Sequence, residues 1–357
     1  MRSILIVHEH FNCLRDENMK KSNQFATSFP AQPLVAPVTL AILSAISTLS
    51  VAETVQSVET VVVTATRVNQ PLSEAASSIT VVSEKEIAQT QPLTFAEILD
   101  TIPNVDTTSS TSVMYNRVSI RGSQPNQITY LIDGMRQDDL TMGGNRPMGV
   151  FADPEILKQV EVRNGGGSAL YGNGGIGGTL ALETKSAADF LADSDKDFGA
   201  LVKVGYGSDS ISWSKSAYAF GRSDMWDVVA GVTRRDSGAA KTSYKGLRST
   251  ADVDNDSTSV FIKATLSPTD NNAATLSYAY DIAHNDSEKG TRFDSYRYEQ
   301  HRIIGQWEYE LDEFINLKTG LQYAQSNFNF ENNVPRIFKD KFESFSGNFQ
   351  NTSRFEL

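Results

Sequence analysis

From about residue 199 onward, apolar residues alternate with small or polar residues along the chain. The pattern recurs in eight stretches separated by turns rich in Asp, Asn, Gly and Ser: residues 199–207, 210–221, 226–236, 257–268, 274–284, 296–311, 315–328 and 342–357. In the fifth stretch, large apolar residues occupy every second position from Leu276 to Ile282, and small or polar residues lie between them. A period of two residues predicts strands with one apolar face and one small or polar face.

Two architectures produce this alternation. In a transmembrane β-barrel the apolar face meets lipid and the other face meets a wet interior. In a soluble antiparallel sandwich the apolar face packs against a second sheet. The long succession of strands favours the barrel, but a closed barrel of eight strands has an interior filled by its own side chains. A preceding domain would therefore lie outside such a barrel, or the barrel would be incomplete.

Residues 72–190 have a different pattern, in which short helical and strand-like segments mix. Residues 92–105 carry apolar residues at a helical period, and Thr94 is a suitable N-cap for that helix. Strand-like runs with a glycine at or near the end occupy residues 117–122, 128–137 and 159–165. These segments predict a small domain of mixed helices and strands.

The segment YGNGGIGGTLALETK, residues 171–185, places Gly172, Gly174 and Gly177 at the spacing of a dinucleotide-binding loop. That loop requires a helix after the glycines, so that the helix N-terminus faces the pyrophosphate. Here an alternating, strand-like run follows instead. The glycines are interpreted as positions where the backbone bends or passes close to a neighbour, and an NAD-dependent enzyme is not expected.

The N-terminus has the pattern of an export signal. Residues 34–51 form a long apolar run, Lys20 and Lys21 precede it, and small residues close it. This order is typical of a secretory signal peptide cleaved after Ala52, although a membrane-anchor helix is the alternative. Met19 is an alternative start of the protein.

Composition excludes several functions. The formal net charge of -11 and the absence of a basic cluster argue against a nucleic-acid partner. The single cysteine, Cys13, lies within the predicted leader, so neither a disulfide framework nor a cysteine metal site is expected. No catalytic motif of the GxSxG or HExxH type is present, and we expect no enzyme activity.

Four motifs then occur in order: ETVVVTATR at residues 59–67, VSIRG at 118–122, YLIDGMRQ at 130–137, and a long stretch at 150–190. Together they resemble the plug of a TonB-dependent outer-membrane receptor, and residues 171–190 are similar in wording to the haem and haemoglobin receptors of that family. The resemblance implies an α+β plug domain followed by part of a transmembrane antiparallel β-barrel, about 8 of an expected 22 strands. It also implies a receptor and transporter without a cofactor, whose transported ligand is haem, haemoglobin or a siderophore.

The resemblance divides the chain into a leader, residues 1–52, a periplasmic tail, 53–71, the plug, 72–190, and a partial barrel, 191–357. The tail would carry the TonB box, which comprises Glu59, Thr60, Val61, Val62, Val63, Thr64 and Ala65. β-branched residues in an extended tail can add as a strand to a sheet edge of TonB, which would supply energy from the inner membrane. An ordinary plug strand is the alternative interpretation.

The same resemblance assigns candidate residues inside the plug. Arg121, Glu161 and Arg163 are predicted to pack the plug against the barrel. The family pattern is incomplete here, because Asn164 stands where an arginine is expected and Gly166 where a proline is expected. This departure weakens the expected connection between plug and barrel.

The ligand candidates are Tyr115, Arg146 and Met148, and of the methionines both Met148 and Met142 are weaker candidates than Tyr115. Haem receptors generally offer a plug histidine, since neutral imidazole suits an axial iron ligand, but this plug has none. Arg146 lies near that position and would meet an anionic haem propionate or siderophore. His284 and His301 lie in predicted strands or at their ends and are interpreted as surface residues.

Length also departs from the family. The 167 residues after Phe190 accommodate about eight strands, so the sequence predicts a C-terminally truncated receptor. Trp213, Trp226 and Trp307 at strand ends are expected in an aromatic girdle facing outer-membrane lipid. The alternative is a soluble periplasmic or surface binding protein with a β-sandwich domain.

Overall fold

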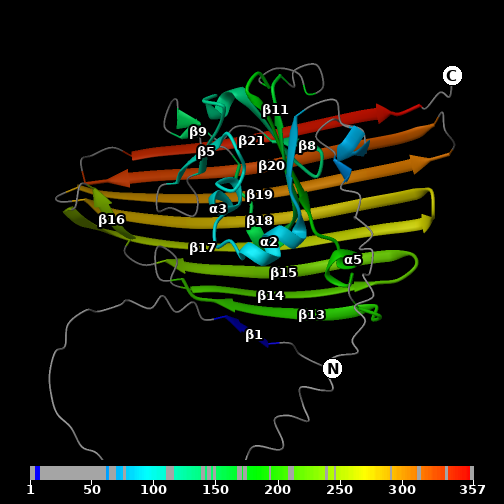
Figure 1. Cartoon of the computed structure of the whole chain (residues 1–357), viewed down its shortest axis with the longest axis horizontal. Helices are drawn as coiled ribbons and strands as arrows, with labels where there is room; N and C mark the ends of the chain where they lie inside the picture. The colour runs from blue at the N-terminus through cyan, green and yellow to red at the C-terminus, as the bar shows by residue number, and fades with distance from the viewer. Residues whose placement is uncertain are drawn as a thin grey trace, which may run out of the picture. The chain divides into compact units, whose positions relative to one another are not determined.

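The computed structural model describes residues 5–8, 62–63, 70–74, 78–109, 116–137, 141–142, 146–147, 150–166, 171, 175–192, 194–207, 213–237, 240–244, 247–289, 292–311, 315–333 and 337–353. Residues 1–10 and 61–357 form one compact unit, and all that follows concerns this unit. It contains an N-terminal domain, here called the plug, and a large antiparallel sheet, here called the wall (Figure 1).

The plug is built on a five-stranded sheet. In spatial order its strands are β4 (Ile79–Val82), β11 (Leu157–Asn164), β12 (Gly178–Thr184), β7 (Ile128–Ile132) and β8 (Met135–Gln137). Only the β12 and β7 pair is parallel, and the other pairs are antiparallel. The predicted strand-like runs are therefore confirmed as strands.

Short helices and strand pairs surround this sheet. The helices are α2 (Glu84–Thr90), α3 (Phe95–Leu99) and α5 (Ala187–Phe190), with 3-10 turns η1 (Leu72–Glu74), η2 (Pro125–Gln127) and η3 (Pro154–Ile156). The strand pairs are β2 (Val62–Val63) with β3 (Gln70–Pro71), β5 (Val105–Ser109) with β6 (Asn116–Ile120), and β9 (Thr141–Met142) with β10 (Arg146–Pro147). The core between helices and sheet includes Phe95, Leu99, Val118, Ile120, Leu157, Val160 and Leu180.

Helix α3 confirms the predicted N-cap but not the predicted length. The Thr94 side chain accepts a hydrogen bond from the Glu97 amide, and the helix ends at Leu99 instead of extending to residue 105. Asn104 has a positive φ of 64°, and Val105 begins β5, so the apolar residues after Leu99 belong to a turn and a strand. Helix α2 was not predicted, although Ser83 and Glu86 form a capping box at its start.

The wall contains eight long antiparallel strands in sequence order. They are β13 (Phe198–Gly205), β14 (Trp213–Arg222), β15 (Trp226–Ser237), β17 (Leu247–Thr269), β18 (Asn272–Lys289), β19 (Arg292–Glu310), β20 (Asn316–Asn332) and β21 (Ile337–Asn351). A short strand β16 (Ala240–Tyr244) pairs with β17, and β1 (Leu5–His8) pairs in parallel with β13. The eight predicted stretches are all strands, and β13 and β21 have no partner that would close the sheet among the described residues.

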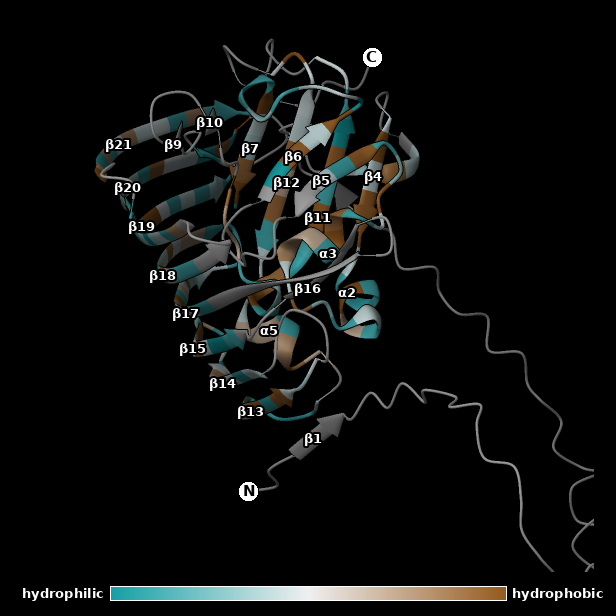
Figure 2. Cartoon of the chain, turned by 90° about the vertical axis from the view of Figure 1, so that its left-hand side faces the viewer, coloured by the Kyte–Doolittle hydropathy of each residue, from teal (hydrophilic) through white to brown (hydrophobic). Residues whose placement is uncertain are grey.

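The two faces of the wall differ as the alternation predicted. Figure 2 shows the wall curving beside the plug, so that one face is turned toward it. On β18, Ser277 and Asp281 are buried on that inward face, whereas Leu276 is 58% exposed on the outward face. A soluble sandwich would bury the apolar face, so this arrangement contradicts the sandwich alternative.

The inward face is covered by a whole domain because the sheet is open. A closed barrel of eight strands would enclose only its own side chains. Of the two predicted arrangements, a domain outside a closed barrel and an incomplete barrel, the structure has the incomplete barrel. None of the described helices is long and apolar enough to cross a membrane.

Candidate functional site: the interface between plug and wall

The most deeply buried charges of this interface are Asp153 and Arg235. Asp153 caps the turn η3, where its Oδ1 accepts a hydrogen bond from the Glu155 amide at 2.9 Å. Its Oδ2 accepts a hydrogen bond from Nη1 of Arg235 on β15. Both side chains are only 1% exposed. Since an unpaired buried charge is costly, each of these two groups depends on the other.

A second cluster centres on the turn between β7 and β8. The Asp133 carboxylate accepts hydrogen bonds from the amide and hydroxyl of Thr184 at 2.9 and 2.7 Å. Lys263 of β17 donates through Nζ to the carbonyl and hydroxyl oxygens of Thr184, both at 3.0 Å, and lies 3.6 Å from Asp133 Oδ1. The Asp133 carbonyl accepts a hydrogen bond from Gln306 of β19 at 2.8 Å. Four segments that are far apart in sequence are thus held together.

Further contacts distribute the connection over the wall. Lys203 of β13 lies 2.8 Å from Glu155, and the Asp227 carboxylate of β15 accepts hydrogen bonds from the first two amides of α5 at 2.8 and 2.7 Å. On the other side, Gln137 of β8 donates to Gln322 Oε1 of β20 at 2.7 Å. The plug is therefore attached along most of the width of the sheet.

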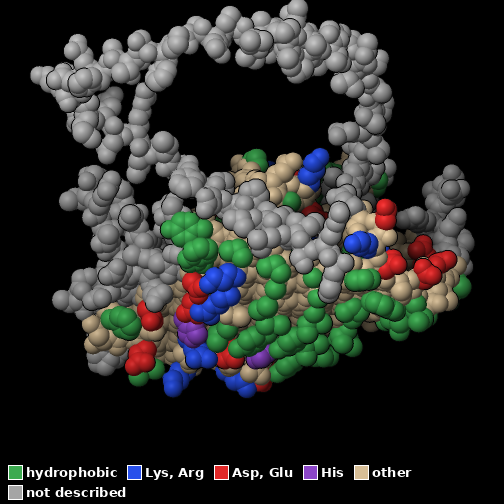
Figure 3. All heavy atoms as spheres, turned by 90° about the horizontal axis from the view of Figure 1, so that it is seen from below, with side chains coloured by type: hydrophobic (Ala, Val, Ile, Leu, Met, Phe, Trp, Pro, Cys, Tyr) green, Lys and Arg blue, Asp and Glu red, His purple; other side chains and the backbone are tan. Residues whose placement is uncertain are grey.

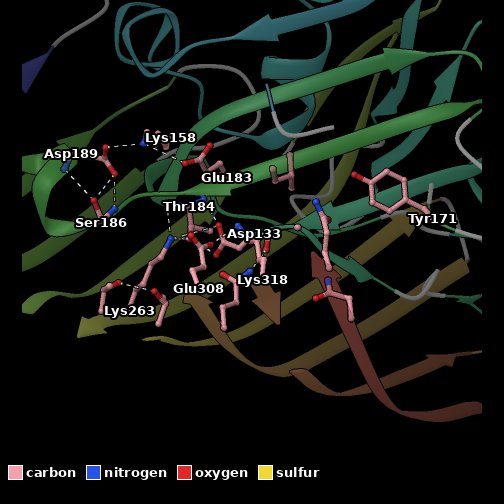
Figure 4. Close-up of a pocket in the computed structure, with 17 residues that line it drawn as sticks. Asp133, Lys158, Tyr171, Glu183, Thr184, Ser186, Asp189, Lys263, Glu308 and Lys318 are labelled. Atoms are coloured by element: carbon pink, nitrogen blue, oxygen red, sulfur yellow. Dashed lines mark hydrogen bonds and ion pairs between the residues drawn. The ribbon is translucent and has the colours of Figure 1, made fainter. Parts of the chain in front are cut away.

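A polar cavity of about 370 Å³ lies between the two parts (Figure 4). Lys158 lies 3.3 Å from both Glu183 and Asp189 in the plug, and Lys318 lies 2.5 Å from Glu308 in the wall. Cations and anions alternate around the cavity, so it has no strong net preference for either sign of charge.

Burial changes the ionisation of the plug groups at this cavity. Burial raises the pKa of Glu183 above its ordinary value, and the neighbouring Lys158 opposes that rise only in part. Burial by itself would lower the pKa of Lys158, but Glu183 and Asp189 outweigh it and leave this pKa raised. The lysine therefore stays protonated at neutral pH and holds both carboxylates.

The glycine run supports the packing of the plug. A Cβ on Gly177 would collide with the side chain of Ser123, and a Cβ on Gly178 would lie 2.7 Å from the carbonyl oxygen of Arg163. Gly178 also has a positive φ of 150°. The interpretation of Gly177 as a point of close backbone approach is confirmed, whereas Gly172 and Gly174 lie outside the described residues.

The residues predicted to pack the plug against the barrel lie in the turn after β6 and on β11. Arg121 is exposed in a turn with a positive φ of 51°, and Arg163 is buried and donates to the Gly166 carbonyl at 2.7 Å within the plug. Glu161 is buried two residues earlier on β11 and accepts a hydrogen bond from Gln159 at 2.7 Å. Within the part of the chain that the structure describes, neither Arg121 nor Arg163 is paired with a carboxylate of the wall, and their contact with the barrel stays a prediction.

The sequence reasoning missed the residues that make the connection, although it quoted their segments. Asp153 lies in the stretch at residues 150–190, and Asp133 lies in YLIDGMRQ, and both segments support the family resemblance. An acidic residue at a cap or turn between strands was the available signal. Their partners Arg235 and Lys263 lie on inward positions of strands, where a buried cation requires an anion from another part of the molecule.

The remaining predicted residues are only partly described. Tyr115, Met148 and the box residues Glu59, Thr60, Val61, Thr64 and Ala65 lie outside the described residues. Val62 and Val63 form β2 and pair with β3, and Arg146 pairs with Met142 between β10 and β9. Among the residues that the structure describes, no group of three or more His, Cys, Asp or Glu side chains is arranged to hold a metal ion.

The histidines and tryptophans lie on the wall. His284 and His301 are partly exposed on strands, where each lies near a carboxylate, Asp256 at 3.3 Å and Glu299 at 3.7 Å respectively. Trp226 and Trp307 are exposed and lie at the same end of the strands, whereas Trp213 lies toward the opposite end. The predicted position of the tryptophans at strand ends is confirmed.

An α+β domain docked on the inward face of an open antiparallel sheet defines the architecture of a plugged, partial barrel. Comparison with known proteins agrees: residues 71–179 match the model of the TonB-dependent Receptor Plug Domain. The resemblance predicted from the sequence is confirmed. The match is to a family of receptors, not of enzymes.

The names of individual relatives refer to more than one ligand. The chain is 35% identical over 181 residues to the vitamin B12 transporter BtuB of Vibrio vulnificus, covering 50% of this chain and 28% of the relative. It is 32% identical over 187 residues to the hemin receptor of Yersinia pestis, covering 52% of this chain and 27% of the relative. The chain therefore spans less than a third of the length of these curated relatives.

A solved structure supports the fold over a longer range. The hemophore receptor HasR of Serratia marcescens, solved in complex with its hemophore HasA and heme, superposes with a TM-score of 0.67 at 21% identity. The superposition covers 79% of this chain and 42% of HasR, so the shared fold extends beyond the plug into the wall.

Proposed function

We propose that this chain is part of an outer-membrane receptor and transporter that takes up haem or another iron chelate. The observation that carries the proposal is the orientation of the wall, whose apolar face points outward while its polar face holds a plug of the TonB-dependent receptor family. Such a sheet is suited to lipid on one side and to a gated, wet interior on the other.

Energy for uptake would arrive through the segment from Glu59 to Ala65, which we propose as the TonB box. Its β-branched residues are suited to adding as a strand to a sheet edge of TonB. The buried contacts of Asp153 and Asp133 would then resist the pull, so that the plug moves only under load.

Haem is proposed in preference to vitamin B12 because the sequence of residues 171–190 resembles the sequences of haem receptors, and a relative named as a hemin receptor matches this chain. Arg146, Tyr115 and Met148 are the proposed ligand contacts. The alternative of a soluble periplasmic binding protein leaves the outward apolar face without a partner.

Two measurements test the proposal. The protein is expressed in a Gram-negative host, and the outer-membrane fraction is expected to contain it after a carbonate wash; recovery in the soluble periplasmic fraction would refute the receptor class. A receptor-deficient host that expresses the complete receptor is then grown with haem or a ferric siderophore as the sole iron source, or with vitamin B12 as the sole cobalamin source, and growth identifies the ligand.

A proline variant tests the energising segment. In the complete receptor, Val62→Pro should abolish uptake without changing membrane insertion, because proline cannot donate the backbone hydrogen bond that strand addition needs. Val55→Pro, in the same predicted tail but outside the box, is the matched control and should transport normally. Equal loss in both variants would contradict the assignment of the box.

A further inference from the structure

The register of the wall places outward side chains in rows that cross the strands. One row, near the middle of the strands, consists of Ile262, Tyr278, Ile303, Tyr323 and Phe345. The neighbouring row toward the Trp226 and Trp307 end carries Leu276 and Leu321, which are 58% and 53% exposed. These rows form an apolar band on the outward face.

The composition changes abruptly toward the other end of the same strands. Two adjacent rows there run from Glu299 through Asn327 to Lys341, and from Arg297 through Asn329 to Lys339. Figure 3 shows charged and histidine side chains gathered beside the hydrophobic part of this surface. Successive rows are about 7 Å apart along a strand, so the charged rows begin within about 15 Å of the Ile303 row.

These two rows enclose a shallow hollow of about 390 Å³ on the outward face of β19, β20 and β21. It is lined by Arg297, Glu299, Asn327, Asn329, Lys339, Asp340 and Lys341. Three cationic side chains, two carboxylates and two amide groups thus line one space that opens outward, and the cations outnumber the anions by one.

Some of the charged side chains that line the hollow have a partner in the chain, and others do not form an ion pair among the described residues. Glu299 accepts a hydrogen bond from the Tyr280 hydroxyl at 3.2 Å, and Lys341 lies 2.6 Å from Glu343. Arg297 and Lys339 make no ion pair among the described residues. Two cations therefore remain available to an anion from outside the chain.

We propose that this hollow binds the phosphate of a phosphorylated lipid whose acyl chains lie on the apolar band. The inference rests on the proposed function, which places the outward face in a membrane. Arginine offers a fork of donors that matches phosphate oxygens, and lysine adds a second charge. A band of apolar side chains ending at two unpaired cations is complementary to a lipid in which an anionic headgroup joins apolar chains.

The test compares two lipids that differ only in the phosphate. The detergent-solubilised chain is titrated with phosphatidic acid and with diacylglycerol of the same acyl composition, and binding is followed by native mass spectrometry. Phosphatidic acid should bind at least tenfold more tightly, and inorganic phosphate alone should compete only weakly. Equal binding of the two lipids would overturn the proposal, and so would full competition by inorganic phosphate, which would indicate a site for free anions.

Variants assign the effect to the hollow. Arg297→Gln combined with Lys339→Gln should remove the preference for phosphatidic acid, whereas Lys196→Gln combined with Arg222→Gln makes the same change in net charge elsewhere and should keep it. Arg297→Lys retains the charge and should lose only part of the affinity, which keeps the test decisive if the double variant fails to fold. A chain that inserts in the membrane but shows no lipid preference contradicts this inference alone, whereas a chain that does not insert contradicts the proposed function.

Discussion

The buried pair Asp153 and Arg235 should control how firmly the plug is docked. Both side chains are 1% exposed, and breaking a buried pair by removing one partner costs about 3–5 kcal/mol. Asp153→Asn removes the charge but keeps a side-chain oxygen for the Glu155 amide, so the cap of η3 should largely survive. The expected loss is therefore close to that of the ion pair itself, about 3 kcal/mol.

A loss of this size has a measurable consequence. At about 1.4 kcal/mol for each factor of ten, the equilibrium between docked and released plug should shift by about a hundredfold. Hydrogen exchange of the detergent-solubilised chain, read by mass spectrometry on peptides from η3 and β11, reports this equilibrium. Exchange of these peptides should accelerate by about the same factor.

The double-mutant cycle separates pairing from other effects. Arg235→Met alone should also destabilise docking, and the combination with Asp153→Asn should cost clearly less than the sum of the single changes. The exposed pair Lys318 and Glu308 is the matched control, and its cycle should give a coupling of about 0–1 kcal/mol. If the changes at Asp153 and Arg235 simply add, the buried pair does not hold the plug in this way.

Three further predictions concern the packing of plug and wall. Gly178→Ala should lower the stability of the chain to denaturant by about 1–3 kcal/mol, because φ is positive and the added Cβ would lie 2.7 Å from the Arg163 carbonyl oxygen. A Cβ added at Gly305 would meet nothing within 4 Å, so Gly305→Ala should be nearly neutral. Equal effects of the two changes would contradict the close approach at Gly178. Because burial raises the pKa of Glu183, the contribution of this side chain to stability is complete below its ordinary pKa of 4.5 and is lost as pH rises through the higher folded value; hydrogen exchange should show wild type losing stability relative to Glu183→Gln as the pH is raised above 4.5, and a constant difference would refute this. Asp227→Ala removes the acceptor for two amides of α5 and should cost about 1 kcal/mol, seen as faster exchange confined to that helix.

Much of the fold could be predicted because it depends on local pattern. Alternation with period two identified all eight strands of the wall, and in the fifth it also identified which positions form the apolar face. It underestimated their length: β17 begins at Leu247, well before the predicted stretch at residue 257. The additional part includes the polar run from Asp252 to Asp256, which pairs with β18 through its backbone and so leaves no signal in side-chain hydrophobicity.

In the helices, too, only features that depend on residues close together in sequence could be predicted. Thr94 was predictable as an N-cap because its hydrogen bond joins residues three apart. The end of α3 at Leu99 was not, because the apolar residues beyond it pack into the core from a turn and a strand with the same spacing that a helix would use.

The sequence by itself determined the family of the plug, the number of wall strands and the separation of apolar and polar faces, since each depends on motifs or on neighbours within a few positions. Only the tertiary structure decided which charges join plug to wall. Asp153 and Arg235 are 82 residues apart, and Lys263 lies 79 residues from Thr184. Such pairs are selected by the docking of two domains, which excludes water from both groups and makes each charge require the other.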